Sequence, residues 1–362
     1  MKVILSALCW AALVGLLVPL RTQATALDVQ AVPGLAAGGG PSAAASLEAQ
    51  TFPTSSGIRF YRITTEDGLS HNTVTSILQD SRGFMWFGTE DGLNRYDGYT
   101  FTVYRHDPDD PYSLRDDSIM TLYEDRDGVL WIGTQTGWLE RLGEERRRFS
   151  HHQFSGPVLS MYQDRTGDFW VGTWDALYRF DRETEGFEIV SSFSESATIL
   201  SIHQDRDGGL WFGSWDGWLH SLDRAQDVLR PVPISVPMTN YRVTSIVEDG
   251  IGSLWIGRDG GGLSRFDRQR EQFTRYQHDP NEPNSLIDNA VSVVHQDSSG
   301  AFWIGTLGGG LDQFDPLTER FVHHQNIPGE PRSLSGNTVL SVYEDRSGVL
   351  WVGTLTGGLS RL

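Results

Sequence analysis

Residues 345–354 read Asp-Arg-Ser-Gly-Val-Leu-Trp-Val-Gly-Thr, and the same arrangement occurs seven times along this chain of 362 residues. The shared pattern is Asp-x-x-Gly-x-apolar-Trp-x-Gly. Its tryptophans are Trp86, Trp131, Trp170, Trp211, Trp255, Trp303 and Trp351. They are 45, 39, 41, 44, 48 and 48 residues apart, a spacing that suits one four-stranded propeller blade per repeat. The repeat therefore predicts an all-β fold: a seven-bladed β-propeller of four-stranded antiparallel blades.

Each repeat divides into four expected strands. A Val or Ile stands six residues before every motif Asp, and its alternation with small polar residues predicts a first, innermost strand. The Asp-x-x-Gly step predicts a tight turn, in which the Asp side chain accepts a backbone N–H and the Gly takes a positive φ. The second strand carries the repeated Trp, which we expect to pack between adjacent blades.

The seventh repeat reaches Leu362 after only three of its four expected strands. Residues 58–62, Ile-Arg-Phe-Tyr-Arg, precede the first repeat and have the pattern of a fourth strand. Pairing of this segment with residues 358–362 would close the ring and remove two exposed sheet edges. We therefore expect the N-terminal strand to close the propeller.

The N-terminal residues predict an exported chain. An apolar run over residues 3–20 follows Lys2 and precedes Ala-Thr-Ala at residues 24–26, which is typical of a cleaved signal peptide over 1–26. The alternative is an uncleaved membrane anchor, because the run is just long enough to span a bilayer. Residues 27–56 are rich in Ala, Gly and Ser and predict a flexible linker, followed by the propeller over 57–362. Cleavage removes Cys9, the one cysteine of the chain, so we expect no disulfide.

Charge narrows the classes of partner. Cleavage also removes Lys2 and Arg21 but no acidic residue, so the formal net charge moves from −18 to −20. An acidic surface repels phosphates, and we expect no nucleic-acid partner. Lys2 is the only lysine, which excludes P-loop and Schiff-base chemistry from the mature chain.

We expect no cofactor and no metal. The adjacent histidine pairs at 151–152 and 323–324 fall on predicted fourth strands, where successive side chains face opposite sides of the sheet. We also find no nucleophile elbow, zinc-binding helix or distinct Ser-His-Asp arrangement. No catalytic residue is therefore nominated.

The motif segments carry a family resemblance. Residues 79–89 (Gln-Asp-Ser-Arg-Gly-Phe-Met-Trp-Phe-Gly-Thr), residues 344–354 and the opening segment 66–72 (Glu-Asp-Gly-Leu-Ser-His-Asn) resemble the two-component regulator propeller repeat, and the resemblance extends over residues 58–362. It implies the periplasmic sensor region of a receptor such as a hybrid histidine kinase, attached to the inner membrane if the full receptor exists. The kinase or cyclase output would belong to a part absent here, so we expect no enzymatic activity in this chain. A homodimer in the full receptor is left open.

A candidate site lies where two sets of connections share one face: those from strand four to strand one, and the turns between strands two and three. The connections after blades one, five and six are long and repeat a Ser-Leu step, whereas those entering blades three and four are the shortest. The candidate ligand-binding residues on this face are Trp174, Asp175, Trp215, Asp216, Trp218, Arg258 and Asp259. Neighbouring indole rings beside carboxylates suit a sugar, because the ring C–H face stacks and the carboxylates accept hydroxyl protons. The alternative is that these rings only fill gaps between blades.

Arg258 breaks the repeat, since it stands where Thr is usual after the Trp-x-Gly step. At the mouth of the ring its guanidinium would bind an anionic group such as a uronic acid carboxylate. The alternative is a local ion pair with Asp259 or Asp216.

Three functions remain open after the sequence is read. The favoured one is a periplasmic ligand-binding sensor of a two-component-type receptor, whose small-molecule or oligosaccharide ligand we expect to be a carbohydrate. The second is a secreted propeller enzyme, a polysaccharide lyase or hydrolase, because carboxylates crowd the rim. The third is a protein-interaction scaffold. The fold does not choose among them.

Overall fold

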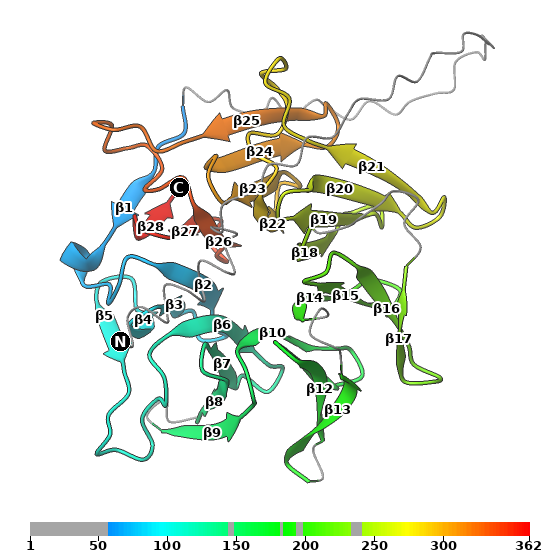
Figure 1. Cartoon of the computed structure of the whole chain (residues 1–362). Coiled ribbons are helices and arrows are strands. Elements are labelled where there is room, and N and C mark those ends of the chain that lie inside the picture. Colours follow the sequence, from blue (N-terminus) through cyan, green and yellow to red (C-terminus); the bar gives the residue numbers. More distant parts are fainter. Residues whose placement is uncertain (1–56, 144–147, 182–183, 193–197, 233–240) are drawn as a thin grey trace, which may run out of the picture. The chain divides into compact units, whose positions relative to one another are not determined.

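The computed structural model describes residues 57–143, 148–181, 184–192, 198–232 and 241–362. The signal peptide and linker predicted over 1–56 lie outside these residues. The described strands form seven four-stranded antiparallel sheets arranged as the blades of a ring (Figure 1). The predicted seven-bladed propeller is confirmed.

The strands of the first four blades follow the chain in order. Blade one is β2 (Val74–Gln79), β3 (Met85–Thr89), β4 (Gly92–Tyr96) and β5 (Phe101–Tyr104). Blade two is β6 (Ile119–Glu124), β7 (Leu130–Thr134), β8 (Trp138–Leu142) and β9 (Phe149–Gln153). Blade three is β10 (Val158–Gln163), β11 (Phe169–Thr173), β12 (Ala176–Asp181) and β13 (Gly186–Ser192). Blade four is β14 (Ile199–Gln204), β15 (Leu210–Ser214), β16 (Leu219–Asp223) and β17 (Val228–Pro231).

The last three blades complete the ring. Blade five is β18 (Val243–Glu248), β19 (Leu254–Arg258), β20 (Gly262–Asp267) and β21 (Gln272–Tyr276). Blade six is β22 (Val291–Gln296), β23 (Phe302–Thr306), β24 (Leu311–Asp315) and β25 (Arg320–His324). Blade seven joins both ends of the propeller: β26 (Val339–Glu344), β27 (Leu350–Thr354), β28 (Leu359–Arg361) and the N-terminal β1 (Tyr61–Ile63), which is followed by the short 3-10 helix η1 (Thr65–Asp67).

The N-terminal strand closes the ring as predicted. Tyr61 pairs with Arg361 in the antiparallel ladder between β1 and β28, which lie side by side in Figure 1. Phe60 is 3 % exposed, and the Arg62 guanidinium donates to the Ser333 hydroxyl at 2.9 Å. Closure thus combines a strand pairing, a buried ring and side-chain hydrogen bonds.

Each repeated Trp is fastened to the motif Asp six residues before it. In all seven blades the indole Nε1 donates to the Oδ2 atom of that Asp, at 2.7–3.0 Å. The Oδ1 atom of the same carboxylate accepts two backbone N–H groups of the turn, as Asp249 does from Ile251 and Ser253. The turn and the packing of Trp between blades were predicted from the sequence, whereas the indole hydrogen bond was not.

Four connections between blades share a second device. They enter blades one, two, six and seven, and each contains a buried leucine: Leu69, Leu114, Leu286 and Leu334. The residue after each leucine donates its backbone N–H to a buried polar side chain on the third strand of the blade that follows. The acceptors are Asn94, Glu140, Asp312 and Ser360, at 2.8–2.9 Å. These hydrogen bonds fix the long connections to the face of the ring.

Candidate functional site

Two of the candidate tryptophans meet on the surface of blades three and four. Trp174 follows β11 and Trp215 follows β15, so both occupy the turn between strands two and three. Their backbone N–H groups donate to Pro157 and Thr198, which precede the first strands of the same blades. The ring centroids are 5.3 Å apart at an interplanar angle of 60°, an edge-to-face contact. Trp174 is 39 % exposed, so part of the pair is open to a ligand.

An arginine extends this pair onto blade five. Arg242, which immediately precedes β18, places its guanidinium 3.5 Å from the centroid of the Trp215 ring. The same guanidinium forms an ion pair with Asp259 at 3.1 Å. Trp174, Trp215, Arg242 and Asp259 therefore form one continuous series over three blades, which we call the aromatic platform.

Sequence reasoning missed Arg242, although a signal was present. The residue before the first strand is Thr, Ser, Pro or Ala in the other six blades and Arg only in blade five. Burial lowers the pKa of Arg242, and the carboxylate of Asp259 opposes that shift. Burial also raises the pKa of Asp259, which Arg242 counteracts.

The two predicted carboxylates, Asp175 and Asp216, directly follow Trp174 and Trp215 in the chain. Asp175 accepts hydrogen bonds from the hydroxyls of Ser155 and of Thr173, the latter at 2.8 Å. Asp216 accepts from the Ser214 hydroxyl in the equivalent turn of blade four. Since a carboxylate has about four lone-pair positions, each group keeps acceptor capacity for a ligand hydroxyl.

Trp218 belongs to the same turn of blade four but has a different role in it. Its backbone carbonyl accepts the Ser214 N–H at 3.0 Å, which closes the turn. Its side chain is 42 % exposed. Trp218 is thus a further accessible indole in the same turn as Trp215.

Arg258 lies beneath the face rather than at the mouth of the ring. It is 1 % exposed, and Asp259 is paired with Arg242 instead. Among the residues that the structure describes, none accepts a hydrogen bond from the three side-chain nitrogens of Arg258. Burial, together with the positive charge of nearby Arg275, lowers the pKa of Arg258 to about 10. The alternative of an ion pair with Asp259 or Asp216 is therefore not realised among these residues.

The candidate histidines lie on fourth strands, as expected, and two of them bind carboxylates of the neighbouring third strand. His151 contacts Glu140, and His323 contacts Asp312 at 2.6 Å. Within the described ranges, no group of three or more His, Cys, Asp or Glu side chains is arranged to hold a metal ion. No helix among those same residues is long and apolar enough to cross a membrane.

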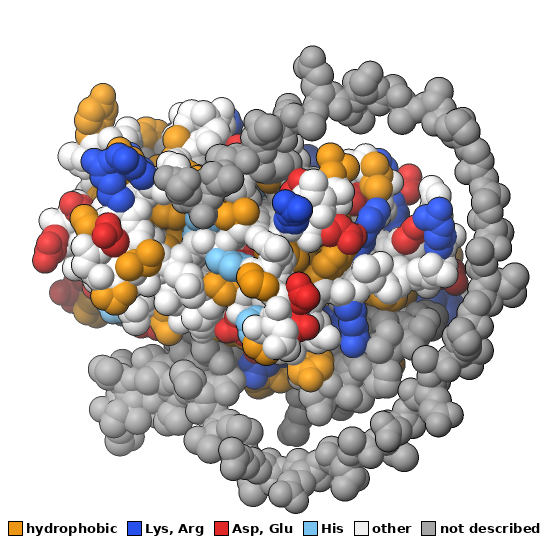
Figure 2. Space-filling view, turned by 90° about the horizontal axis from the view of Figure 1, so that it is seen from above, with side chains coloured by type: hydrophobic (Ala, Val, Ile, Leu, Met, Phe, Trp, Pro, Cys, Tyr) orange, Lys and Arg blue, Asp and Glu red, His pale blue; other side chains and the backbone are white. Residues whose placement is uncertain are grey.

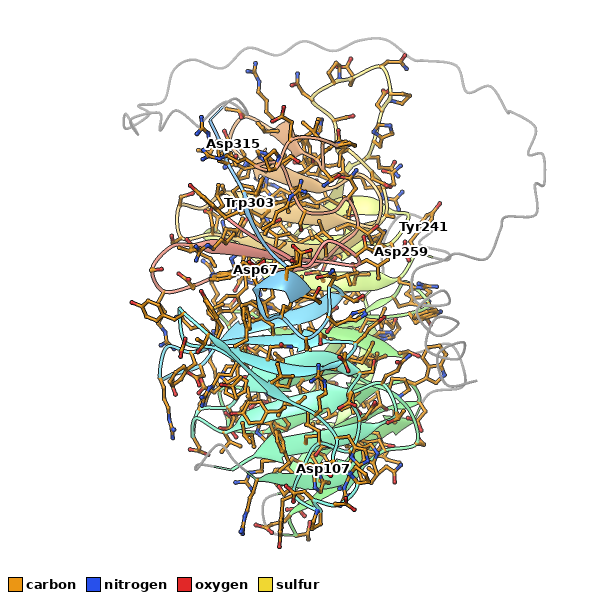
Figure 3. All side chains as sticks on the ribbon, turned by 90° about the vertical axis from the view of Figure 1, so that its left-hand side faces the viewer. Asp67, Asp107, Tyr241, Asp259, Trp303 and Asp315 are labelled. Carbon is orange, nitrogen blue, oxygen red and sulfur yellow. The ribbon has the colours of Figure 1, made fainter. Side chains whose placement is uncertain are left out.

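The figures show where Asp259 of the aromatic platform lies and how charged and hydrophobic side chains are distributed on the surface. Tyr241 and Asp259 lie close together at one side of the ring when it is seen edge-on (Figure 3). Figure 2 shows acidic and basic side chains interspersed with hydrophobic ones over another view of the described surface. The net negative charge of the chain is therefore accompanied by positive groups on this view of the surface.

The repeats match a known family. The two-component regulator propeller matches residues 68–91, 113–136, 152–175, 193–216 and 333–356. The chain carries two-component regulator propeller repeats. Part of it is also 46 % identical over 71 residues to histidine kinase P4 of Formosa agariphila, a match that covers 20 % of this chain and 5 % of that protein.

Solved structures share the propeller. The extracellular domain of BT3049 of B. thetaiotaomicron, described as a hybrid two-component system, is 25 % identical with a TM-score of 0.72, and the match covers 84 % of this chain and 41 % of that one. A virginiamycin B lyase of Staphylococcus aureus, 12 % identical with a TM-score of 0.64 over 84 % of this chain and 97 % of that one, shares the fold alone. This chain spans less than half the length of the two-component relatives it resembles.

Proposed function

We propose that this propeller is the ligand-binding region of a periplasmic sensor of the two-component type, and that its ligand is a saccharide. The regulator propeller repeats and the likeness to the extracellular domain of BT3049 support the sensor role. Because the chain spans only part of the length of those relatives, its connection to a signalling output is part of this proposal. The chain itself would bind and would not catalyse.

The observation that carries the saccharide proposal is the edge-to-face pair of Trp174 and Trp215 with Arg242 over the second ring. A sugar presents apolar C–H faces that stack on indole, and hydroxyls that donate to carboxylates such as those of Asp175 and Asp216. Each aromatic contact of this kind is worth roughly 0.5–1.5 kcal/mol beyond the area it buries. Two such contacts would together add about 1–3 kcal/mol to the binding of an oligosaccharide.

The propeller fold does not itself require these rings. The equivalent positions of the other five blades hold Glu90, Gln135, Asp259, Leu307 and Leu355. A packing need common to every blade would not select Trp in two neighbouring blades only. By contrast, the motif tryptophan occurs in every repeat. In blade three it is Trp170, which is fully buried and donates to Asp164, as expected of a structural residue. The surface pair is thus better explained by a ligand.

The experiment is a saccharide array probed with the chain lacking residues 1–26, followed by calorimetry on each hit and an assay for reducing ends and unsaturated products. We expect binding of at least one oligosaccharide without turnover. Turnover that is lost when rim carboxylates are mutated would replace the sensor by an enzyme. Absence of any saccharide hit would remove the saccharide from the proposal.

A further inference from the structure

Blade five differs from the other blades on the face that packs against blade four. Three of its side chains have buried donor atoms without an acceptor among the described residues: the three nitrogens of Arg258, the Oγ of Ser264 and one terminal nitrogen of the half-buried Arg275. The strand register puts them on one face. Ser264 pairs with Ile256, two residues before Arg258 on β19, and also pairs with Arg275 on β21. Two guanidinium groups and a hydroxyl therefore converge within one layer.

In blades one, two and six, the same positions carry groups with hydrogen-bond partners. Thr or Ser replaces Arg258 in the other six blades; the hydroxyl of Thr89, for example, donates to the Gly92 carbonyl at 2.8 Å. At the position of Ser264, Glu140 and Asp312 are acceptors for backbone N–H groups of their connections. Where blades two and six have a carboxylate with a backbone partner, blade five thus has Ser264, next to the guanidinium groups of Arg258 and Arg275.

Within the part of the chain that the structure describes, no carboxylate is recorded as a partner of these donors. The layer between blades four and five is otherwise apolar, with Leu219, Val243 and Ile256 fully buried. Asp259 is already engaged by Arg242. Because a buried cation without a counter-ion is strongly unfavourable, the arrangement calls for an anion from outside the chain.

We propose that Arg258, Ser264 and Arg275 bind the carboxylate of an acidic saccharide, such as a uronic acid. This deepens the proposed function and rests on it. A guanidinium donates two parallel hydrogen bonds to a planar carboxylate, and the serine hydroxyl supplies a third donor. On a protein of net charge −18, a local pair of arginines is also what retains an anionic ligand that the whole surface would repel.

The site lies directly beside the aromatic platform. A Cβ added to Gly261 would be 2.9 Å from the Cβ of Arg258 and 3.2 Å from the Cβ of Tyr241, so both side chains approach the space beside Gly261. Tyr241 is the neighbour of Arg242 in the sequence and is 40 % exposed. Arg258 therefore lies near Tyr241, next to the surface on which neighbouring sugar rings would stack.

The test uses sodium glucuronate as the probe, with sodium chloride of equal ionic strength and glucose as references. Thermal unfolding of the parent chain should shift to higher temperature with glucuronate and not with the references. Arg258→Thr, which restores the residue of five other blades, and Arg275→Gln should abolish the shift and weaken glucuronate in calorimetry by at least about tenfold. Arg265→Gln is the matched control, because Arg265 lies over Trp255 on the opposite face of blade five.

Other outcomes would overturn the proposal. An equal glucuronate shift in Arg258→Thr places the anion elsewhere, and the absence of a shift in the parent chain removes the site. If Arg258→Thr melts lower than the parent without any anion dependence, Arg258 is structural. An equal shift with sodium sulfate that depends on Arg258 would contradict selectivity for a carboxylate.

The aromatic platform is tested separately. In Trp174→Ala with Trp215→Ala, the shift caused by glucuronate alone should persist, while binding of oligosaccharides weakens. If no oligosaccharide binds the parent chain but the Arg258-dependent shift remains, the saccharide platform fails and the anion site stands. If oligosaccharides bind equally well after Arg258→Thr, the anion site fails and the platform stands.

Discussion

The guanidinium of Arg242 lies 3.5 Å from the centroid of the Trp215 ring and is itself held by Asp259 at 3.1 Å. One face of the Trp215 indole is therefore fixed from blade five, while its contact with Trp174 comes from blade three. Rings fixed before a ligand arrives lose less side-chain freedom on binding, which favours affinity. The platform is held by its own neighbours and does not depend on the ligand for its order.

Replacement of Arg242 should loosen the platform. A cation–π contact at a partly exposed site is worth about 0.5–1 kcal/mol, so Arg242→Ala should weaken a bound oligosaccharide by roughly two- to fivefold. Arg242→Lys keeps the positive charge and should lose less. Calorimetry on both variants measures the effect, and equal affinities for the parent and the Ala variant would separate Arg242 from the site.

The hydrogen bond between the motif Trp and Asp should contribute to the stability of each blade. Asp249 accepts the indole N–H of Trp255 with one oxygen and two backbone N–H groups with the other. Asn at this position offers only one carbonyl oxygen, so either the indole or the turn loses its acceptor. Because an unsatisfied buried donor costs about 1–3 kcal/mol, Asp249→Asn should lower the free energy of unfolding by that amount in urea titrations. An unchanged midpoint would show that the hydrogen bond adds nothing.

Most of the fold could be predicted from the repeat. An Asp, a Gly and a Trp at constant spacing indicate a turn followed by a buried ring, and seven copies of this pattern are visible in a single sequence. The constant interval of six residues between the motif Asp and Trp, as in Asp249 and Trp255, was also a signal for the indole hydrogen bond, which was not inferred from the sequence. The meeting of Trp174 and Trp215 followed from equivalent positions in consecutive repeats.

The surroundings of Arg258 did not follow from the sequence. The side chains that lie around Arg258 depend on strand register, which brings Ser264 from β20 and Arg275 from β21 to the same face of the blade. These surroundings depend also on the ion pair between Arg242 and Asp259, the carboxylate that directly follows Arg258 in the chain. Contacts between side chains of different strands and blades are decided by packing, and a single sequence does not display them.

Ring closure by β1 predicts a graded loss of stability. Deletion of residues 58–63 should remove the fourth strand of blade seven and sharply lower the melting temperature. Phe60→Ala is a finer probe, since burying a Phe is worth about 3–5 kcal/mol in truncation series. Tyr61→Ala is its control, because Tyr61 is 54 % exposed. Equal melting curves for the two variants would argue against closure through Phe60.

His323 should make the stability of blade six depend on pH. Its Nδ1 contacts Asp312 at 2.6 Å and its Nε2 contacts the Pro283 carbonyl at 2.9 Å, so both ring nitrogens face acceptors, which favours the positively charged imidazole. The hydrogen bond to Asp312 raises the pKa of His323 above its ordinary 6.5. The stability from this charge is thus complete below pH 6.5 and is lost as the pH rises through the raised pKa.

His323→Gln should therefore destabilise the chain at pH 6.5, and its difference from the parent should shrink as the pH rises. Burial, with a contribution from Asp288, raises the pKa of Asp312, so Asp312→Asn serves as the second arm of a double-mutant cycle. In the Asp312→Asn background, His323→Gln should have little effect at any pH. A difference between parent and His323→Gln that grows with pH would reverse the assignment of charge.

The central claim is that Trp174 and Trp215 bind the ligand, and calorimetry on the double variant Trp174→Ala with Trp215→Ala tests it most directly. With an oligosaccharide found on the array, affinity should fall by about tenfold or more, given about 1.4 kcal/mol for each factor of ten. The melting temperature should fall less than after Trp170→Ala, which removes a buried ring between blades. If the double variant binds the oligosaccharide as tightly as the parent chain, the rings serve packing only and the claim is contradicted.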